Sequence, residues 1–200
     1  MYLQIVLAIV VGYLAGSVPW GLVLTRFAGL GDIRKIGSGN IGATNVLRTG
    51  RKDLALATLL LDIFKAGAVA GLFWWGASKN LGFLAGFMAV IGHNFPVWLR
   101  FKGGKGVASS LGLMLCMTPV VGIETALTWL VVAFAFKYSS LSALVAMTLA
   151  PVFAIFAASP SAVVCYAALA LLSIWRHRSN IRRLIHGTES KISFRKKHAR

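Results

Sequence analysis

Acidic residues are scarce in this sequence. Only 5 Asp and Glu stand against 21 Lys and Arg, so the formal net charge is +16. Hard cations are bound by several oxygen ligands, many of them carboxylates, and no cluster of acids is present to supply them. In a soluble protein such a charge would indicate nucleic-acid binding, but basic residues also collect in the cytoplasmic loops of membrane proteins. We adopt the second interpretation and expect no nucleic-acid partner.

Cysteine and processing signals are nearly absent. The 2 cysteines, Cys116 and Cys165, lie inside apolar runs, and the sequence has no CxxC motif and no paired Cys/His spacing. This argues against a disulfide framework and a thiolate metal site, so we expect no metal and no cofactor. The segment MYLQIVLAIV has no basic residue ahead of its apolar core, which argues against a cleaved secretory signal and predicts a first membrane span.

Apolar residues, in contrast, are abundant. They make up 58% of the 200 residues, and the mean hydropathy is +0.76. Several runs reach the length of a membrane span, which predicts a single all-α integral membrane domain over residues 1–200. The expected spans include 3–25, 54–75, 81–99, 141–158 and 161–175. Small residues recur four positions apart at Gly12/Gly16, Gly67/Gly71 and Gly82/Gly86, where they let helices approach closely.

The region 107–136 allows two interpretations. A single helix over these residues would be about 45 Å long, which exceeds an ordinary crossing. Thr118-Pro119 interrupts the region near its middle, and a residue before proline resists the helical conformation. The alternative is two short spans joined by a tight turn.

The distribution of positive charge favours the split. With seven spans, the segments 26–52, 100–106 and 137–140 and a basic tail of about 176–200 lie on one side, and they hold 19 of the 21 Lys and Arg residues. The positive-inside rule therefore predicts seven transmembrane helices, with the N-terminus outside and the C-terminus cytoplasmic. Lys65 falls inside a span, three residues after Asp62, and we expect a structural ion pair there rather than a proton relay.

Four polar islands lie on the predicted cytoplasmic side, at residues 37–52, 92–106, 137–142 and 176–189. They are rich in glycine, hydroxyl side chains and basic side chains. Glycine lets backbone N–H groups approach a ligand, and Gly104-Lys105-Gly106 precedes a predicted span, where a helix N-terminus favours anions. The combination indicates a binding site for a phosphate-like anion, although the GxxxxGK[ST] pattern of a P-loop is absent.

Each island alone has a simpler explanation. The glycines of 37–42 could form plain turns, and Lys102 and Lys105 could set topology or contact anionic lipid. His93 could be a satisfied histidine at a span end, and the arginines of the tail could serve orientation. The convergence of all four islands on one face favours the binding site.

The islands resemble the bacterial acyl-phosphate:glycerol-3-phosphate acyltransferase family over almost the whole chain. The resemblance is carried by SGNIGATNVLR (38–48), GHNFPVWLRFKGGKGVA (92–108), KYSSLSA (137–143) and RHRSNIRRLIHGTE (176–189). It implies transfer of a fatty acyl group from acyl phosphate to the 1-hydroxyl of glycerol 3-phosphate, as the first acylation of phospholipid synthesis. It also implies a bacterial cytoplasmic (inner) membrane location. The HxxxxD motif of other glycerol-phosphate acyltransferases is missing, because Trp98, Arg182 and Lys191 stand five residues after His93, His177 and His186.

The resemblance and the charges together give a set of candidate site residues. Catalytic roles are predicted for Ser38, Arg48, Lys105 and His186. Substrate-binding roles are predicted for Gly39, Asn40, Thr44, Asn45, His93, Asn94, Lys102, Gly103, Gly104, Ser140, Ser142 and Asn180. We expect a monomer that also contacts lipid of the inner leaflet, where the acyl chain would lie in a groove between spans.

The two phosphates are divided between these residues as follows. Ser38, Thr44, Ser142 and the backbone of 103–104 are expected to hold the acyl-phosphate phosphoryl group. The glycerol 3-phosphate is assigned to Arg48, Lys105, Asn180 and His186. For the hydroxyl proton, a substrate phosphate oxygen with a second pKa of about 6 and a histidine base, His93 or His186, stay open.

Two other classes of function stay open at this point. A membrane transporter of phosphate or an organic phosphate could use a basic, glycine-rich site, but it would place broken helices near the midplane. A lipid-binding or assembly factor without chemistry would tolerate alanine at Ser38 or Arg48.

Overall fold

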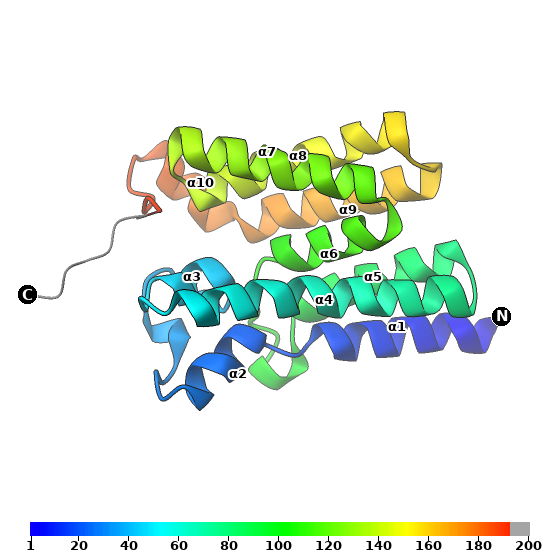
Figure 1. The fold of residues 1–200 in the computed structure, drawn as a ribbon, viewed down its shortest axis with the longest axis horizontal. Helices are drawn as coiled ribbons and strands as arrows, with labels where there is room; N and C mark the ends of the chain where they lie inside the picture. Colours follow the sequence, from blue (N-terminus) through cyan, green and yellow to red (C-terminus); the bar gives the residue numbers. More distant parts are fainter. Residues whose placement is uncertain (193–200) are drawn as a thin grey trace, which may run out of the picture.

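The computed structural model describes residues 1–192, and every regular element in that range is helical (Figure 1). The helices are α1 (Tyr2–Gly16), α2 (Trp20–Phe27), η1 (Ile33–Lys35), α3 (Ala43–Leu47), α4 (Lys52–Gly76), α5 (Lys79–Asn94), η2 (Val97–Leu99), α6 (Val107–Met117), α7 (Pro119–Phe136), α8 (Ser139–Ala157), α9 (Pro160–Arg176) and α10 (Arg178–Ile185). The predicted all-α class is therefore confirmed. The last part of the predicted basic tail, residues 193–200, lies outside the described residues.

The region 107–136 forms two helices, as the split interpretation predicted. α6 ends at Met117 and α7 begins at Pro119, so Thr118 is the only residue between them. Pro119 fits the first position of α7, where its missing N–H is not needed. In Figure 1 the two helices run in opposite directions, and the same alternation holds along α1, α4, α5, α6, α7, α8 and α9.

The first predicted span, 3–25, is not one continuous helix. α1 ends at Gly16 and α2 begins at Trp20, with Val18-Pro19 between them. Pro19 cannot donate a helical hydrogen bond and disfavours helix at Val18. The carbonyl of Val18 instead accepts a hydrogen bond from Lys65 Nζ of α4, at 3.0 Å.

Length and apolar composition mark five segments as able to cross a membrane. These are Tyr2–Phe27, Lys52–Gly76, Lys79–Leu99, Pro119–Phe136 and Ser139–Ala157. The apolar helices α6, with 11 residues, and α9, with 17, are shorter than an ordinary span. The predicted number of seven crossings and the orientation of the termini stay predictions.

Small residues set the closest helix contacts. Gly12 and Gly16 of α1 face Ala85 and Ala89 of α5, and a Cβ atom added at Gly16 would collide with the Ala89 carbonyl oxygen. This is the contact that the spacing of these glycines predicted. α1 is thereby packed closely against α5, the helix that carries His93.

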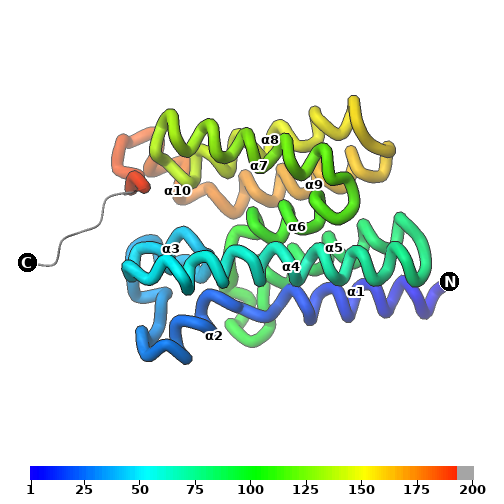
Figure 2. The backbone as a smooth tube through the Cα atoms, in the orientation of Figure 1, coloured from blue at the N-terminus to red at the C-terminus, as the bar shows by residue number. Residues whose placement is uncertain are grey.

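The polar islands gather at one end of the bundle. In Figures 1 and 2, α3, α10 and the segments that lead into them lie at the left-hand end, away from the N-terminus. α4 and α8 begin near this end and α7 and α9 end near it, so residues distant in the sequence become neighbours. Ile192 N, for example, donates to Lys137 O at 2.7 Å.

Candidate active site

A cavity of about 250 Å³ opens where the two glycine-rich loops meet. Its lining comes from three of the four islands: Ser38, Gly39, Asn40, Gly103, Lys105, Arg176, Arg178 and Ser179. Five of these eight residues were predicted as site residues. The lining contains three cationic side chains and no carboxylate, which suits an anionic ligand.

The first loop is shaped by Asn45, which is buried. Its amide nitrogen donates to Ile33 O, Ile36 O and Asn40 O at 3.0, 3.0 and 2.7 Å. Its amide oxygen accepts from the backbone N–H of Ser38 at 3.0 Å and from the Ser38 hydroxyl at 3.3 Å. Asn45 therefore fixes the turn that places Ser38 on the cavity wall, and its own polar atoms are used within the loop.

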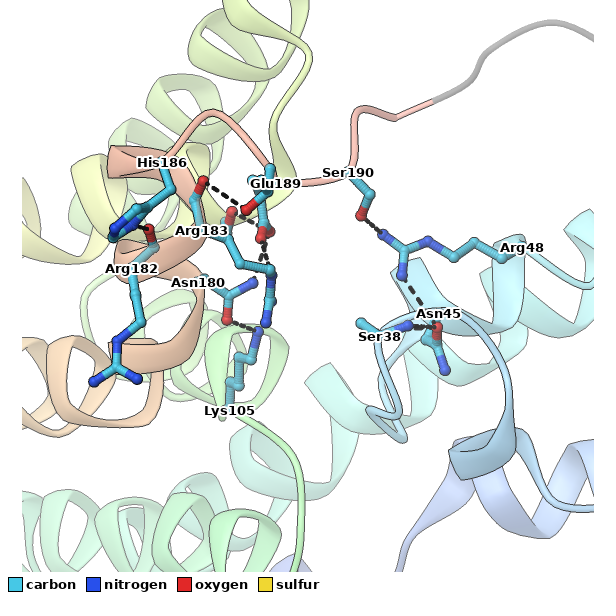
Figure 3. Close-up of polar contacts among 12 residues, drawn as sticks. Ser38, Asn45, Arg48, Lys105, Asn180, Arg182, Arg183, His186, Glu189 and Ser190 are labelled. Carbon is cyan, nitrogen blue, oxygen red and sulfur yellow. Dashed lines mark hydrogen bonds and ion pairs between the residues drawn. The ribbon is translucent and has the colours of Figure 1, made fainter.

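Arg48 and Thr44 connect this loop to other islands. Arg48 Nη1 donates to Asn45 Oδ1 at 3.4 Å, and Nη2 donates to Ser190 Oγ at 2.5 Å (Figure 3). The Thr44 hydroxyl lies 3.2 Å from the Ser139 hydroxyl at the start of α8. Three segments far apart in the sequence thus meet around α3.

A second cluster surrounds Glu189. Lys105 Nζ donates to Asn180 Oδ1 at 2.5 Å, and Asn180 Nδ2 donates to Glu189 Oε1 at 2.7 Å (Figure 3). The same carboxylate accepts from the Ser140 hydroxyl at 2.7 Å and from Arg183 Nε at 2.6 Å. Glu189 therefore holds the last island against α8 and aligns Asn180 with Lys105.

Electrostatics in this cluster shift two pKa values. Burial lowers the pKa of Lys105 to about 8, with Glu189 opposing the shift and nearby arginines adding to it. Burial alone would raise the pKa of Glu189, but hydrogen bonds from Ser140 and Asn180 and the contact with Arg183 outweigh it and lower the pKa. Lys105 is mostly protonated at neutral pH and Glu189 is ionised, so the cluster holds opposite charges side by side.

The loop at Gly103-Gly104 differs from the expectation that its N–H groups face a ligand. Gly103 N donates to Asn94 O at 3.2 Å and Gly104 N donates to His93 O at 3.0 Å. Arg176 holds both glycine carbonyls, with Nη2 at 2.9 Å from Gly103 O and 2.8 Å from Gly104 O. Within residues 1–192, the next N–H groups along the chain, from 105 to 109, make no hydrogen bond.

His93 lies behind this loop, not on the cavity wall. Its Nδ1 accepts a hydrogen bond from Lys65 Nζ at 2.9 Å, and Lys65 pairs with Asp62 at 2.8 Å. A Cβ atom at Gly104 would collide with the His93 ring, so glycine is required for the loop to pass over it. The predicted Asp62–Lys65 pair is present, and His93 joins it.

The remaining predicted residues are spread more widely. The Ser142 hydroxyl donates to Tyr138 O of its own helix at 2.8 Å, and the buried Asn94 amide has no partner among the described residues. His186 Nδ1 donates to Arg182 O at 2.7 Å, and Figure 3 shows its ring on the outer side of α10, away from Arg48. Lys102 lines a different cavity.

Four residues that organise the site had no role assigned from the sequence: Ser139, Arg176, Glu189 and Ser190. Glu189 had a usable signal, because it is the only acidic residue in the four islands. Ser190 lies one residue beyond the last island, and Arg176 resembles any arginine at a span end. Ser139, Ser140 and Ser142 all carry hydroxyls, and the sequence does not indicate which of them lies near Thr44.

Comparison with known proteins places these observations in one family. A family model described as glycerol-3-phosphate acyltransferase matches residues 6–187. Proteins named glycerol-3-phosphate acyltransferase are 58% identical in Rhodospirillum rubrum, over 94% of this chain and 91% of the relative, and 57% identical in Paramagnetospirillum magneticum, over 98% and 97%.

Solved structures agree with the sequence match. A crystal structure of PlsY (YgiH), an integral membrane glycerol 3-phosphate acyltransferase in its glycerol 3-phosphate form, is similar with a TM-score of 0.89 at 32% identity, over 94% of this chain and 96% of that one. Its lysophosphatidic acid form gives a TM-score of 0.87 at 33% identity, over 94% of each chain. A multi-helix membrane fold, two glycine-rich loops around a basic cavity and these matches lead to one conclusion: the chain belongs to the glycerol-3-phosphate acyltransferase family.

Proposed function

We propose that this chain transfers a fatty acyl group from acyl phosphate to the 1-hydroxyl of glycerol 3-phosphate. The products are lysophosphatidic acid and inorganic phosphate, and the step opens phospholipid synthesis. The observation that supports this most is the cavity between the two glycine-rich loops, with Lys105, Arg176 and Arg178 in its wall. The glycerol 3-phosphate and lysophosphatidic acid forms of the similar crystal structures support the acceptor and the product.

Acyl phosphate fits as donor because it is already activated. It is a mixed anhydride whose leaving group is phosphate, so the protein needs mainly to position two anions and to neutralise developing charge. The sequence lacks the HxxxxD pair that could supply a histidine base. The cavity offers cations and hydroxyls, which suits this task.

The two phosphates are assigned to two sets of residues in and around the cavity. Ser38 and the free N–H groups from 105 onward, at the N-terminus of α6, would hold the acyl-phosphate group. The sequence assigned this phosphate to the N–H groups of Gly103 and Gly104, but those groups donate to Asn94 O and His93 O within the loop. The N–H groups from 105 onward replace them in this proposal. Thr44 extends this side through Ser139, and Ser142 keeps its place only if its hydroxyl turns away from Tyr138 O.

Glycerol 3-phosphate would bind between Arg48 and the Lys105–Asn180 pair. Arg48 reaches the second cluster through Ser190, which is adjacent in the chain to Glu189. His186 would complete this side by turning its free Nε2 inward, since only Nδ1 has a partner in the described part of the chain.

The reaction balances without a protein base. The glycerol 1-oxygen attacks the acyl carbon, the bond from that carbon to the bridging phosphate oxygen breaks, and the electron pair leaves with phosphate. A phosphate oxygen takes the hydroxyl proton, since its second pKa is about 6. His93 lies behind Gly104 with Nδ1 engaged by Lys65, which disfavours it as the base. A folded His93→Ala variant that keeps most of its kcat would exclude His93 as the base.

The setting proposed for this chemistry is the cytoplasmic face of a bacterial inner membrane. We infer a single membrane domain with seven crossings, the N-terminus outside and the basic C-terminus inside, acting as a monomer beside inner-leaflet lipid. The gathering of the islands at one end of the bundle supports a face-located site and disfavours a transporter, whose site would lie near the midplane.

The choice of donor is tested directly by supplying one donor at a time. The purified chain in detergent is given glycerol 3-phosphate with either palmitoyl phosphate or palmitoyl-CoA. Lysophosphatidic acid from palmitoyl phosphate alone is expected. Product from palmitoyl-CoA alone would keep the acyltransferase and reject the donor. Product from neither, in a folded sample, would reject the proposed reaction.

A further inference from the structure

A second cavity, of about 440 Å³, lies where α2 and η1 meet the loop that contains η2. It is lined by Arg26, Arg34, Trp98, Leu99, Arg100 and Lys102, and it shares no lining residue with the active-site cavity. We propose that this cavity binds the phosphate of an anionic phospholipid headgroup. The proposal goes beyond the acyl transfer, because neither substrate is assigned to this cavity.

The charges of the cavity suit a phosphate. Asp32 pairs with Arg34 at 2.6 Å and more distantly with Arg26 at 3.8 Å. Arg100 and Lys102 have no side-chain hydrogen bond or ion pair in the part of the chain that the structure describes. Four cations thus share a single carboxylate, and two of them are free to contact an anionic ligand. Arginine forks match phosphate oxygens well, and phosphate accepts several such bonds at once.

The backbone that presents these cations is unusual. Arg100 and Phe101 are consecutive non-glycine residues with positive φ, at 50° and 61°. Residues other than glycine rarely adopt this backbone conformation, so the surrounding structure must enforce it. Phe101 N donates to Pro96 O at 3.0 Å and Lys102 N donates to Leu99 O at 3.1 Å, which closes the turn. The turn brings Trp98, Arg100 and Lys102 into one wall.

The rim of the cavity favours a lipid over free phosphate. Trp98, which lines the cavity, is 63% exposed, and Phe27 and Phe101, each next in the chain to a lining arginine, are 90% and 58% exposed. Large aromatic side chains beside basic ones are typical of the headgroup level of a membrane. α2 carries both Arg26 and Phe27 at its end, so the cationic wall and the aromatic rim meet there. A headgroup could place its phosphate among the arginines while its acyl chains stay in the bilayer.

The cavity is connected to both loops of the active site. Lys102 directly precedes Gly103, and Arg34 lies four residues before Ser38. Leu99 packs against the buried cluster that includes Ile33, Ile41 and Val46, beneath the first loop. A bound headgroup would therefore steady both loops, and anionic lipid is expected to raise the acyl-transfer rate.

The test measures lipid binding itself. The delipidated chain is mixed with phosphatidylglycerol or phosphatidylcholine, and the lipid retained per protein is counted by native mass spectrometry. The parent is expected to retain one phosphatidylglycerol in preference to phosphatidylcholine, and Arg100→Gln and Arg26→Gln are each expected to reduce that retention at least fivefold. Lys137→Gln is the matched control, because it removes one charge on the same end from a residue with φ of 62°, close to that of Arg100.

The outcomes separate the lipid from other ligands. Retention that is equal in the parent and in both cavity variants overturns the proposal. If millimolar inorganic phosphate displaces phosphatidylglycerol, and if lipid-free protein binds phosphate to the same extent, the cavity is a site for free phosphate. That result overturns the lipid assignment. None of these readings depends on acyl transfer, so a failure here is distinct from a failure of the proposed reaction.

Discussion

Lys65 Nζ of α4 lies 2.9 Å from His93 Nδ1 of α5, and the same imidazole ring faces Gly104 on the active-site loop. Lys65 also donates to Val18 O at the break between α1 and α2, and it pairs with Asp62. One buried ammonium group thus connects α4, α5 and the chain break before α2. Through His93 it supports the loop that carries Lys105.

Replacing Lys65 is expected to destabilise the protein strongly. Lys65→Met leaves Asp62 buried without a cation, and breaking such a pair costs about 3–5 kcal/mol. The midpoint of thermal unfolding in detergent should fall by roughly 5–15 °C. The double variant Asp62→Asn with Lys65→Met should recover part of that loss, and Lys79→Met should be near the parent because Lys79 is exposed. A single variant as stable as the parent contradicts the structural role.

Gly104→Ala should reduce activity with little loss of fold. The new methyl group would collide with the His93 ring, so the loop and Lys105 must move. A displacement of about 1 Å in a positioning element can cost about 10²-fold in rate. Gly76→Ala is the control, because a Cβ atom there has open space around it. We expect a kcat/KM loss of about 10- to 100-fold at position 104 and none at position 76, and equal activities would show that the loop does not position the substrates.

The pH dependence of kcat/KM should report Lys105. Burial lowers its pKa to about 8, and the cationic form is the one that holds phosphate. As the pH rises through about 8, Lys105 loses its proton, so kcat/KM for glycerol 3-phosphate should fall on the alkaline side. Lys105→Arg should move that fall well above pH 8, since arginine keeps its charge. If the decrease of kcat/KM at alkaline pH is unchanged in Lys105→Arg, that decrease reports the titration of another group.

Glu189→Gln should weaken acceptor binding. The amide keeps the shape of the carboxylate, but it cannot pair with the charge of Arg183 and it presents only one oxygen to its three donors. Hydrogen bonds to charged groups contribute about 1.5–3 kcal/mol, and Arg183 is partly exposed, so we expect a loss of about 1 kcal/mol and a KM for glycerol 3-phosphate raised about fivefold. Glu124→Gln, in α7, controls for loss of an acid elsewhere. An unchanged KM would show that Asn180 and Lys105 do not need Glu189.

The fold was predictable where composition and proline decide it. Apolar runs, the break at Thr118-Pro119 and the small-residue pairs all correspond to observed elements. The same proline argument applies to Val18-Pro19, yet the apolar run through it predicted one span. There the freed carbonyl is satisfied by Lys65, a partner 47 positions away that no local pattern reveals.

The site was predictable as a set of islands and less so as individual contacts. Glycine, hydroxyl and basic residues mark the loops, and topology brings the loops together. The direction of each side chain depends on tertiary packing: Asn45 turns into its own loop, Ser142 bonds to its own helix, and His93 joins an ion pair behind the loop. The left-handed turn at Arg100 and Phe101 also has no signal in the sequence, because neither residue is glycine.

The most direct test of the account is a single reaction with palmitoyl phosphate and glycerol 3-phosphate, followed at the same time for lysophosphatidic acid and inorganic phosphate. Equal amounts of both products are expected from the parent chain. A folded Arg48→Ala variant, which lacks the guanidinium that connects the first loop to Ser190 in the parent, is expected to have at least a 100-fold lower rate. Phosphate release without lysophosphatidic acid, or equal rates from parent and variant, would contradict the account.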